Sequence, residues 1–165
     1  MAKIAVLGHG VVGSGVLEVL LTHHDSIERR AKEEISVKRI LDLREFPGLP
    51  YSDIFTKDFS LILNDPEIAI VVEVMGGITP AYDYVKACLN NGKSVVTSNK
   101  ELVAAKGAEL IALAQKNNLN FLFEASCRII NHSMQHLFEL LCMLGRTQML
   151  IKTHRRRDRI RLTVP

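Results

Sequence analysis

The sequence predicts an α/β fold in which helices cover both faces of a doubly wound parallel sheet. Strand-like and helix-like segments alternate from residue 3 to residue 123, a pattern typical of repeated βα units. Residues 68–74 form a near-continuous apolar run, as expected for a central strand covered on both faces. A glycine-rich turn follows the first strand-like segment, and it is the most specific single indication of function.

That first strand is Lys3–Leu7, and Gly8, Gly10 and Gly13 follow it with the spacing G-x-G-x-x-G. In a dinucleotide-binding turn the first glycine permits a sharp exit from the strand, the second leaves room for a pyrophosphate, and the third lets the helix pack closely. A tight turn that binds nothing is the alternative. The position between a strand and a helix favours a Rossmann-type dinucleotide site at the helix N-terminus.

A helix is predicted from Val11 into the low twenties, and residues 26–34 either continue it or form a second helix. The adjacent His23 and His24 would face different sides of a helix. This arrangement favours solvated surface over a metal site.

The second strand is predicted at Ser36–Leu43. Its expected buried residues are Val37, Ile40 and Leu41. The end of this strand carries Asp42 and Arg44, where such a fold meets the adenosine ribose. An acidic residue there accepts hydrogen bonds from the ribose hydroxyls of NAD, whereas an arginine accommodates the 2′-phosphate of NADP, so the sequence leaves both cofactors open. The spacing from Gly13 to Asp42 exceeds the usual value of about 20 residues, and a long first helix would account for it.

Residues 46–50 form a predicted Pro/Gly loop, and Tyr51–Phe55 is too short to assign. A short helix over Asp58–Asn64 is expected to stop at the Asp65-Pro66 pair, because the residue before a proline disfavours helical backbone angles.

The strongest predicted strand is Ile68–Val74, and Gly76 and Gly77 follow it where a cofactor would lie. Thr79 is the candidate N-cap of the next helix, with Pro80 in its first turn. The remaining predicted elements are the end of this helix at Asn90, a buried strand Ser94–Thr97, a helix Glu101–Asn117 that a break at Gly107 could interrupt, and a strand Asn120–Phe123.

The carboxyl ends of parallel strands meet at one edge of a sheet, which is where ligands bind in such folds. Five glycine or polar segments are predicted to fall on this edge. They are Gly8–Gly13, Asp42–Arg44, Gly76–Gly77, Ser98–Lys100 and Glu124. Their coincidence is harder to explain by structural roles alone than any one of them.

Four motifs together resemble the N-terminal NAD(P)-binding domain of homoserine dehydrogenase, over about residues 2–126. They are Gly8-His9-Gly10-Val11-Val12-Gly13, Glu73-Val74-Met75-Gly76-Gly77, Val96-Thr97-Ser98-Asn99-Lys100 and Phe123-Glu124-Ala125-Ser126. The resemblance implies an NAD- or NADP-dependent oxidoreductase that interconverts L-aspartate 4-semialdehyde and L-homoserine in threonine and methionine biosynthesis.

The resemblance also implies site residues. It places Lys100 beside the nicotinamide and the substrate as the catalytic residue, and it makes Glu124 a ligand of a structural monovalent cation such as sodium. The implied cofactor-lining residues are Val11, Val12, Thr97 and Ser98. An ammonium at a strand end could polarise an aldehyde carbonyl or join a proton relay. For Lys100 the alternative is a surface lysine at a helix start, and for Glu124 it is hydrogen bonding to backbone.

After residue 126 the chain departs from the family pattern, because Cys127-Arg128-Ile129 replaces the expected small residue and run of glycines. We therefore expect residues 1–126 to form the NAD(P)-binding domain and residues 127–165 to be an atypical helical and basic tail. An amphipathic helix is predicted over Ile130–Leu144. The hypothesis is that this tail is out-of-frame or disordered sequence, and that the substrate domain is absent.

The charge balance supports this division. Residues 146–165 hold seven basic residues against one acidic residue, so residues 1–145 carry a net charge of −3 within the overall +3. The basic Arg155–Arg157 cluster is accompanied by no aromatic ring except His154, which gives little support to nucleic-acid binding. No apolar run reaches about 18 residues, so no membrane span is expected.

The three cysteines, Cys88, Cys127 and Cys142, have no metal-ligand spacing and are interpreted as buried reduced thiols of a cytoplasmic protein without a signal peptide.

Three functions then remain. The favoured one is a homoserine dehydrogenase with little or no turnover in this form. The others are a non-catalytic NAD(P)-binding module that needs a partner chain, and a nucleic-acid-binding protein. Oligomeric state is not predicted.

Overall fold

Six parallel strands form one sheet with the spatial order β3-β2-β1-β4-β5-β6, in a computed structural model that describes residues 2–22, 24–32 and 34–123. The strands are β1 (Ala2–Leu7), β2 (Ile35–Leu41), β3 (Phe55–Thr56), β4 (Ile68–Glu73), β5 (Ser94–Thr97) and β6 (Phe121–Phe123). Because the chain starts in the middle of the sheet and builds outward on both sides, the order reverses between β1 and β4. The predicted fold class, a doubly wound parallel sheet, is confirmed.

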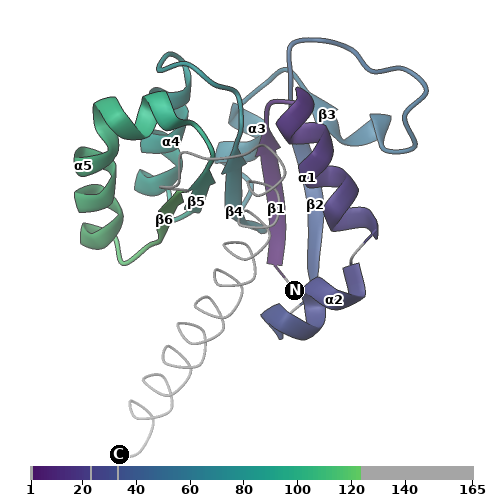
Figure 1. Ribbon diagram of the computed structural model, residues 1–165, viewed down its shortest axis with the longest axis horizontal. Helices are drawn as coiled ribbons and strands as arrows, with labels where there is room; N and C mark the ends of the chain where they lie inside the picture. Colours follow the sequence, from purple (N-terminus) through teal and green to yellow (C-terminus); the bar gives the residue numbers. More distant parts are fainter. Residues whose placement is uncertain (1, 23, 33, 124–165) are drawn as a thin grey trace, which may run out of the picture.

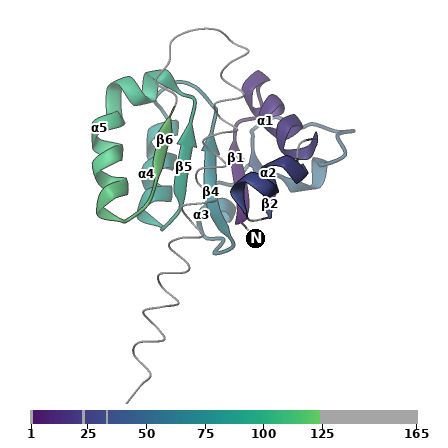
Figure 2. The ribbon, with the colours of Figure 1, turned by 60° about the horizontal axis from the view of Figure 1, so that its bottom comes forward.

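Helices connect the strands and cover both faces (Figures 1 and 2). They are α1 (Val11–Thr22), α2 (His24–Ala31), α3 (Ser60–Leu63), α4 (Ala81–Asn90), α5 (Lys100–Lys116) and the short 3-10 helix η1 (Ser52–Ile54). In both views α1 and α2 lie beside β1 and β2, while α4 and α5 lie beside β5 and β6.

Side chains of the central strands alternate between two hydrophobic cores. In β1, Ile4 and Val6 pack into the core that includes Val16 and Leu20 of α1. Ala5 and Leu7 point the other way, into the core formed with α3, α4 and α5. Successive side chains of a strand point to opposite faces, so the apolar runs Ile4–Leu7 in β1 and Ile68–Val72 in β4 require helices on both sides.

Several boundaries differ from the predictions. The second strand ends at Leu41 instead of residue 43, and Val37 is only half-buried. The spacing to Asp42 comes from the separate helix α2, not from one long helix. The long helix α5 runs through Gly107 without a break.

The predicted cap of α4 was wrong. Pro80, not Thr79, is the N-cap, no side chain caps the helix, and the Thr79–Pro80 peptide is cis. The backbone satisfies this helix start, because Tyr82 N donates to Ile78 O at 2.8 Å and Tyr84 N donates to Pro80 O at 3.1 Å.

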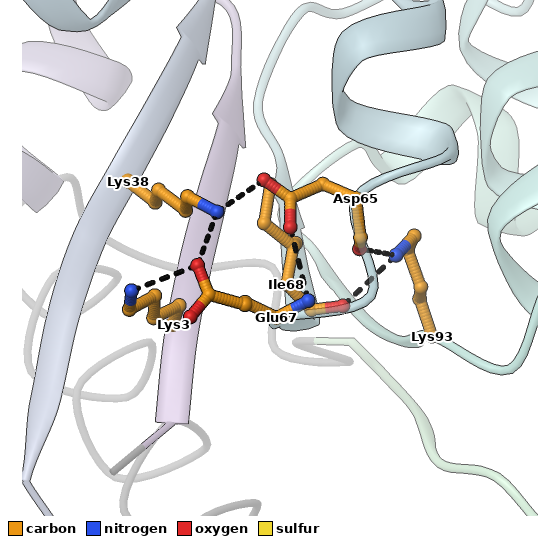
Figure 3. Close-up of polar contacts among 6 residues, drawn as sticks. All are labelled: Lys3, Lys38, Asp65, Glu67, Ile68 and Lys93. Carbon is orange, nitrogen blue, oxygen red and sulfur yellow. Dashed lines mark hydrogen bonds and ion pairs between the residues drawn. The ribbon is translucent and has the colours of Figure 1, made fainter.

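A network of charged side chains joins the strands near their amino ends (Figure 3). Lys38 Nζ bonds both Asp65 and Glu67, and Lys3 Nζ donates to Glu67 at 2.9 Å. Lys93, only 3% exposed, donates to the carbonyl oxygens of Asp65 at 2.6 Å and Ile68 at 2.9 Å. Burial lowers the pKa of Lys93. These contacts lie at the opposite edge of the sheet from the glycine turn.

Cys88 lies in the core as a free thiol, and burial raises its pKa to about 12. This confirms that Cys88 is a buried free thiol, whereas Cys127, Cys142 and the predicted helix 130–144 lie outside the described residues. Within the described ranges, no helix is long and apolar enough to cross a bilayer. The domain boundary near residue 126 stays a prediction.

Candidate functional site

The three glycines of the first turn have different surroundings. Gly8 has a φ of +99°, and a Cβ there would lie 3.1 Å from Met75. A Cβ on Gly13 would lie 2.1 Å from the carbonyl oxygen of Gly8. A Cβ on Gly10 would meet no protein atom within 4 Å. The fold itself therefore requires glycine at Gly8 and Gly13, whereas the free space at Gly10 is available to a ligand.

The N-terminus of α1 opens onto that free space. Ser14 N donates to Gly10 O at 2.9 Å, so the helix begins directly after the glycine, and its first turn contains no acidic residue. Val11 is 89% exposed and Val12 is 37% exposed. The unpaired N–H groups and the positive end of the helix dipole favour an anion at this position, such as a pyrophosphate.

Asp42 follows β2 and is held by its neighbours. Its carboxylate accepts hydrogen bonds from His9 N at 2.8 Å and from the backbone N, Nε and Nη2 of Arg44 at 2.9, 3.0 and 2.9 Å. The Arg44 side chain is the main reason that the pKa of Asp42 is well below its usual range, and the same contact raises the pKa of Arg44. The Asp42 side chain is 9% exposed, whereas the Arg44 side chain is 61% exposed.

The variable residue inside the glycine motif, His9, is buried in a group of aromatic rings. Its ring centroid lies 4.5 Å from that of Phe46 and 5.0 Å from that of Phe55, both edge-on, and Tyr51 Oη is 3.4 Å from Nε2. Burial lowers the pKa of His9, which favours the neutral form of the imidazole. Sequence reasoning missed this group. The available signal was that three of the nine aromatic residues fall within residues 46–55.

A cleft of about 430 Å³ connects the glycine turn with the ends of β2 and β4. Its size is within the range of small-molecule sites, and its walls are mostly apolar. The lining residues include Gly8, Gly10, Asp42, Leu43, Arg44, Lys57, Met75, Pro80 and Tyr84. A smaller neighbouring pocket shares Asp42, Arg44 and Lys57, so two cationic side chains border both hollows.

A second polar group ties the ends of β4 and β5 together. The carboxylate of Glu73, at 0% exposure, accepts hydrogen bonds from Met75 N at 2.8 Å, Thr97 Oγ1 at 2.5 Å and Asn99 Nδ2 at 3.4 Å. Asn99 also caps α5, since its Oδ1 accepts from Leu102 N at 3.1 Å. Sequence reasoning assigned no role to Glu73 or Asn99, although an acidic residue within an otherwise apolar strand was a usable signal.

The structure brings most of the predicted site residues to the carboxyl edge of the sheet. Gly8, Gly10, Asp42 and Arg44 line one cleft, with Gly13 beneath the turn. Gly76 and Gly77 form the loop after β4, with φ values of +79° and +70°.

The predicted site residues at the end of β5 and the start of α5 differ in exposure. The Thr97 side chain is buried on Glu73, so any contact with a ligand would come from its backbone. Ser98 is half-buried, and Lys100 is exposed as the first residue of α5. Glu124 lies outside the described residues, and no group of metal-ligating side chains occurs among those described. The individual ligand-binding roles stay predictions.

Comparison with known proteins identifies a family that this chain resembles in both sequence and structure. The family model described as "Homoserine dehydrogenase, NAD binding domain" matches residues 8–124. Homoserine dehydrogenases of Bacillus subtilis and Pseudomonas aeruginosa are 33% and 38% identical to this chain, each over 75% of the chain and 29% of the relative. Crystal structures of homoserine dehydrogenase from Thiobacillus denitrificans and S. aureus superpose with TM-scores of 0.70 and 0.69, at 41% and 38% identity.

These structures match 75% and 76% of this chain and 29% and 32% of their own chains. The chain thus spans about three tenths of the length of the relatives that it matches.

Proposed function

This chain belongs to the homoserine dehydrogenase family, and from that premise we propose that it binds NAD(P) as the cofactor-binding part of an enzyme that interconverts L-aspartate 4-semialdehyde and L-homoserine. The observation that carries the proposal is the space at Gly10. An added Cβ would meet no protein atom there, at the N-terminus of α1 and beside the cleft. A glycine that the fold does not need is accounted for by a ligand that comes close to the backbone.

The residues present fit a dinucleotide laid across the carboxyl edge. The free N–H groups at the start of α1 would hold the pyrophosphate, and the cleft between Leu43 and Tyr84 would take the adenosine half. The other half would then extend over the ends of β4 and β5, toward Ser98 and Lys100. The nicotinamide supplies hydride transfer when it is bound.

We propose that the preferred cofactor is NADP. The Asp42 carboxylate already accepts four hydrogen bonds from His9 and Arg44, so it is poorly placed to accept more from ribose hydroxyls. Arg44 covers it and projects into the cleft, and Lys57 adds a second cation at the same wall. Lys57 is paired with the exposed carboxylate of Glu45 at 2.8 Å. Arg44 and Lys57 nevertheless place two cationic donors at one hollow, which favours the 2′-phosphate of NADP.

The Arg44→Ala variant is expected to weaken NADPH binding by about 1.5–3 kcal/mol, because a charge-assisted contact to phosphate is lost. NADH binding should stay the same or improve, since the Asp42 carboxylate is then free to accept from the ribose. Fluorescence titration with both cofactors measures this, with Arg29→Ala as a control on the surface of α2. Equal losses for the two cofactors would contradict the assignment and point to Asp42 instead.

We propose Lys100 as the group that polarises the substrate carbonyl or donates a proton as hydride arrives. Its ammonium starts α5 at the carboxyl edge, and it is exposed. A surface lysine at a helix start is the alternative.

General acid catalysis contributes about 10²–10⁴-fold, so Lys100→Ala should reduce turnover by that order. The assay mixes the chain with the remaining part of the Thiobacillus denitrificans relative and follows NADPH formed from homoserine. Lys116→Ala, at the other end of the same helix, is the control. If the two variants have the same rate, Lys100 is a surface lysine.

The alternative function is a non-catalytic NAD(P)-binding module that acts with a partner chain. The family model that matches residues 8–124 describes the NAD-binding domain alone, and it agrees with either function. We expect the 165 residues alone to bind NAD(P)H and to oxidise homoserine at least about a thousandfold more slowly than a full-length relative, because positioning of the substrate supplies much of the acceleration. Titration and a turnover assay on the same preparation measure both properties. Rapid homoserine oxidation by this chain alone would overturn this expectation, and absence of NAD(P)H binding would overturn both functions. The sodium ion at Glu124 and the cytoplasmic location stay predictions.

A further inference from the structure

The buried carboxylate of Glu73 lies at the centre of the carboxyl edge, as the last residue of β4. It is fully buried, and its hydrogen-bond donors among the described residues are neutral: the Met75 N–H, the Thr97 hydroxyl and the Asn99 amide. Burying a charge is expensive unless hydrogen bonds replace its hydration. The three donors come from two segments, the loop after β4 and the end of β5. The Glu73 carboxylate therefore fixes these two segments relative to each other.

The side chains that bond Glu73 also form hydrogen bonds with other protein groups. Thr97 Oγ1 donates to Glu73 and accepts from Asn99 N at 2.9 Å. The Asn99 amide nitrogen also donates to Gly77 O at 2.6 Å, while its oxygen accepts from Leu102 N. Thr97 and Asn99 therefore have little hydrogen-bonding capacity left for a ligand. They fix the backbone of the β4–α4 loop, the end of β5 and the first turn of α5 relative to one another.

This chemistry depends on a carboxylate. A glutamine at position 73 would keep the shape but would present one acceptor and one donor. Its amide nitrogen would face either the Thr97 hydroxyl, whose proton would lose its acceptor, or the Met75 N–H, where two donors would meet. Either orientation loosens one of the tied segments.

The network lies on one side of the proposed cofactor site. Gly10 follows β1, and Asp42 and Arg44 follow β2, on the adenosine side of the point where the strand order reverses. Glu73 ends β4, Met75 lies in the loop after it, Thr97 ends β5 and Asn99 caps α5. Ser98 and Lys100 flank the Asn99 cap, so their backbone positions follow from these bonds.

We propose that Glu73 is a positioning residue for the nicotinamide half of the cofactor, acting through Thr97 and Asn99 on the segment that carries Ser98 and Lys100. The proposal rests on the proposed NAD(P)-binding function. Its distinctive consequence is selectivity: loosening the network should impair contacts to one half of the dinucleotide and leave the adenosine half untouched.

The test compares NADPH with 2′-phospho-ADP-ribose, which lacks only the nicotinamide ring, by calorimetric titration of the full chain. Glu73→Gln should weaken NADPH binding about tenfold or more, the size of effect expected when a buried hydrogen-bond donor loses its partner, and should leave 2′-phospho-ADP-ribose within about twofold. Thr97→Val, which removes the hydroxyl from the same network, should show the same selective loss. It provides a second measurement if Glu73→Gln does not fold.

Lys93→Met is the matched control. Lys93 is also a buried charged residue that bonds backbone near β4 and β5, but it lies at their amino ends (Figure 3). It should lower the melting temperature and leave both affinities within about twofold, because it is remote from the cofactor edge.

The outcomes separate the inference from the function on which it rests. Equal losses for both ligands, no loss for either, or a wild-type chain that binds the two ligands equally well would overturn the role of Glu73 while NAD(P) binding stands. A wild-type chain that binds neither ligand, and neither NADH nor ADP-ribose, would overturn the proposed function, and the role of Glu73 with it. If only NADH and ADP-ribose bind, they take the place of the phosphorylated pair in the same test.

Discussion

Replacing Gly10 by valine is expected to abolish dinucleotide binding, with a loss of at least about a hundredfold in affinity, or about 2.7 kcal/mol. The backbone of Gly10 faces open space, so the branched side chain meets no protein atom but fills the volume that a pyrophosphate would occupy. The protein should stay folded, losing no more than about 1 kcal/mol for a poorer N-cap residue.

The measurement is titration with NADPH, accompanied by a melting curve of the same sample. Gly10→Ala is the graded comparison: its single methyl group should reduce affinity by less than valine does, because it intrudes less far. A Gly10→Val chain that melts normally and binds NADPH as well as the parent would show that the glycine motif here is structural only.

The fold was predictable because its strongest signals are local. The apolar runs of β1 and β4 are continuous because helices cover both faces, and such runs are visible in any window of the sequence. The glycine spacing is equally local, so the start of α1 at Val11 was predicted correctly.

The elements that were missed depend on contacts between distant segments. The two-residue strand β3 exists through its pairing with Ile40 and Leu41 of β2, and nothing within Phe55–Thr56 itself indicates a strand. Likewise, the burial of His9 depends on rings that lie 37 to 46 positions later in the chain. Propensity is a weak guide where tertiary pairing decides the conformation.

In the candidate site, too, local sequence signals identified some residues, whereas contacts between distant segments were visible only in the structure. Residue types at strand ends identified Asp42 and Arg44, but their mutual ion pair, which decides what a ribose can reach, became visible only in the structure. Glu73 was quoted as part of a motif without a role, because its three hydrogen-bond donors come from residues up to 26 positions away. Position along the chain predicted which residues gather at the carboxyl edge, and the structure was needed to show which of them contact one another.

Replacing Gly13 by alanine is expected to have the opposite consequence to Gly10→Val, with a loss of at least about 3 kcal/mol in the free energy of unfolding. The new Cβ would lie 2.1 Å from the carbonyl oxygen of Gly8 and 3.0 Å from its carbonyl carbon. These are backbone atoms at the end of β1, where Gly8 N bonds Leu41 O at 2.8 Å, so they cannot move without disturbing the centre of the sheet.

Urea denaturation followed by circular dichroism measures the effect, and Gly107→Ala is the matched control. Gly107 is also a buried glycine within a helix, but the nearest atom to a Cβ there would be a methyl carbon of Val103 at 3.3 Å, and no backbone atom of another element would be in contact. Because alanine favours a helix interior by about 1 kcal/mol over glycine, that variant should be close to neutral. If Gly13→Ala unfolds at the same urea concentration as Gly107→Ala, helix α1 is free to move away from β1, and the close packing of the glycine turn is not what holds the two together.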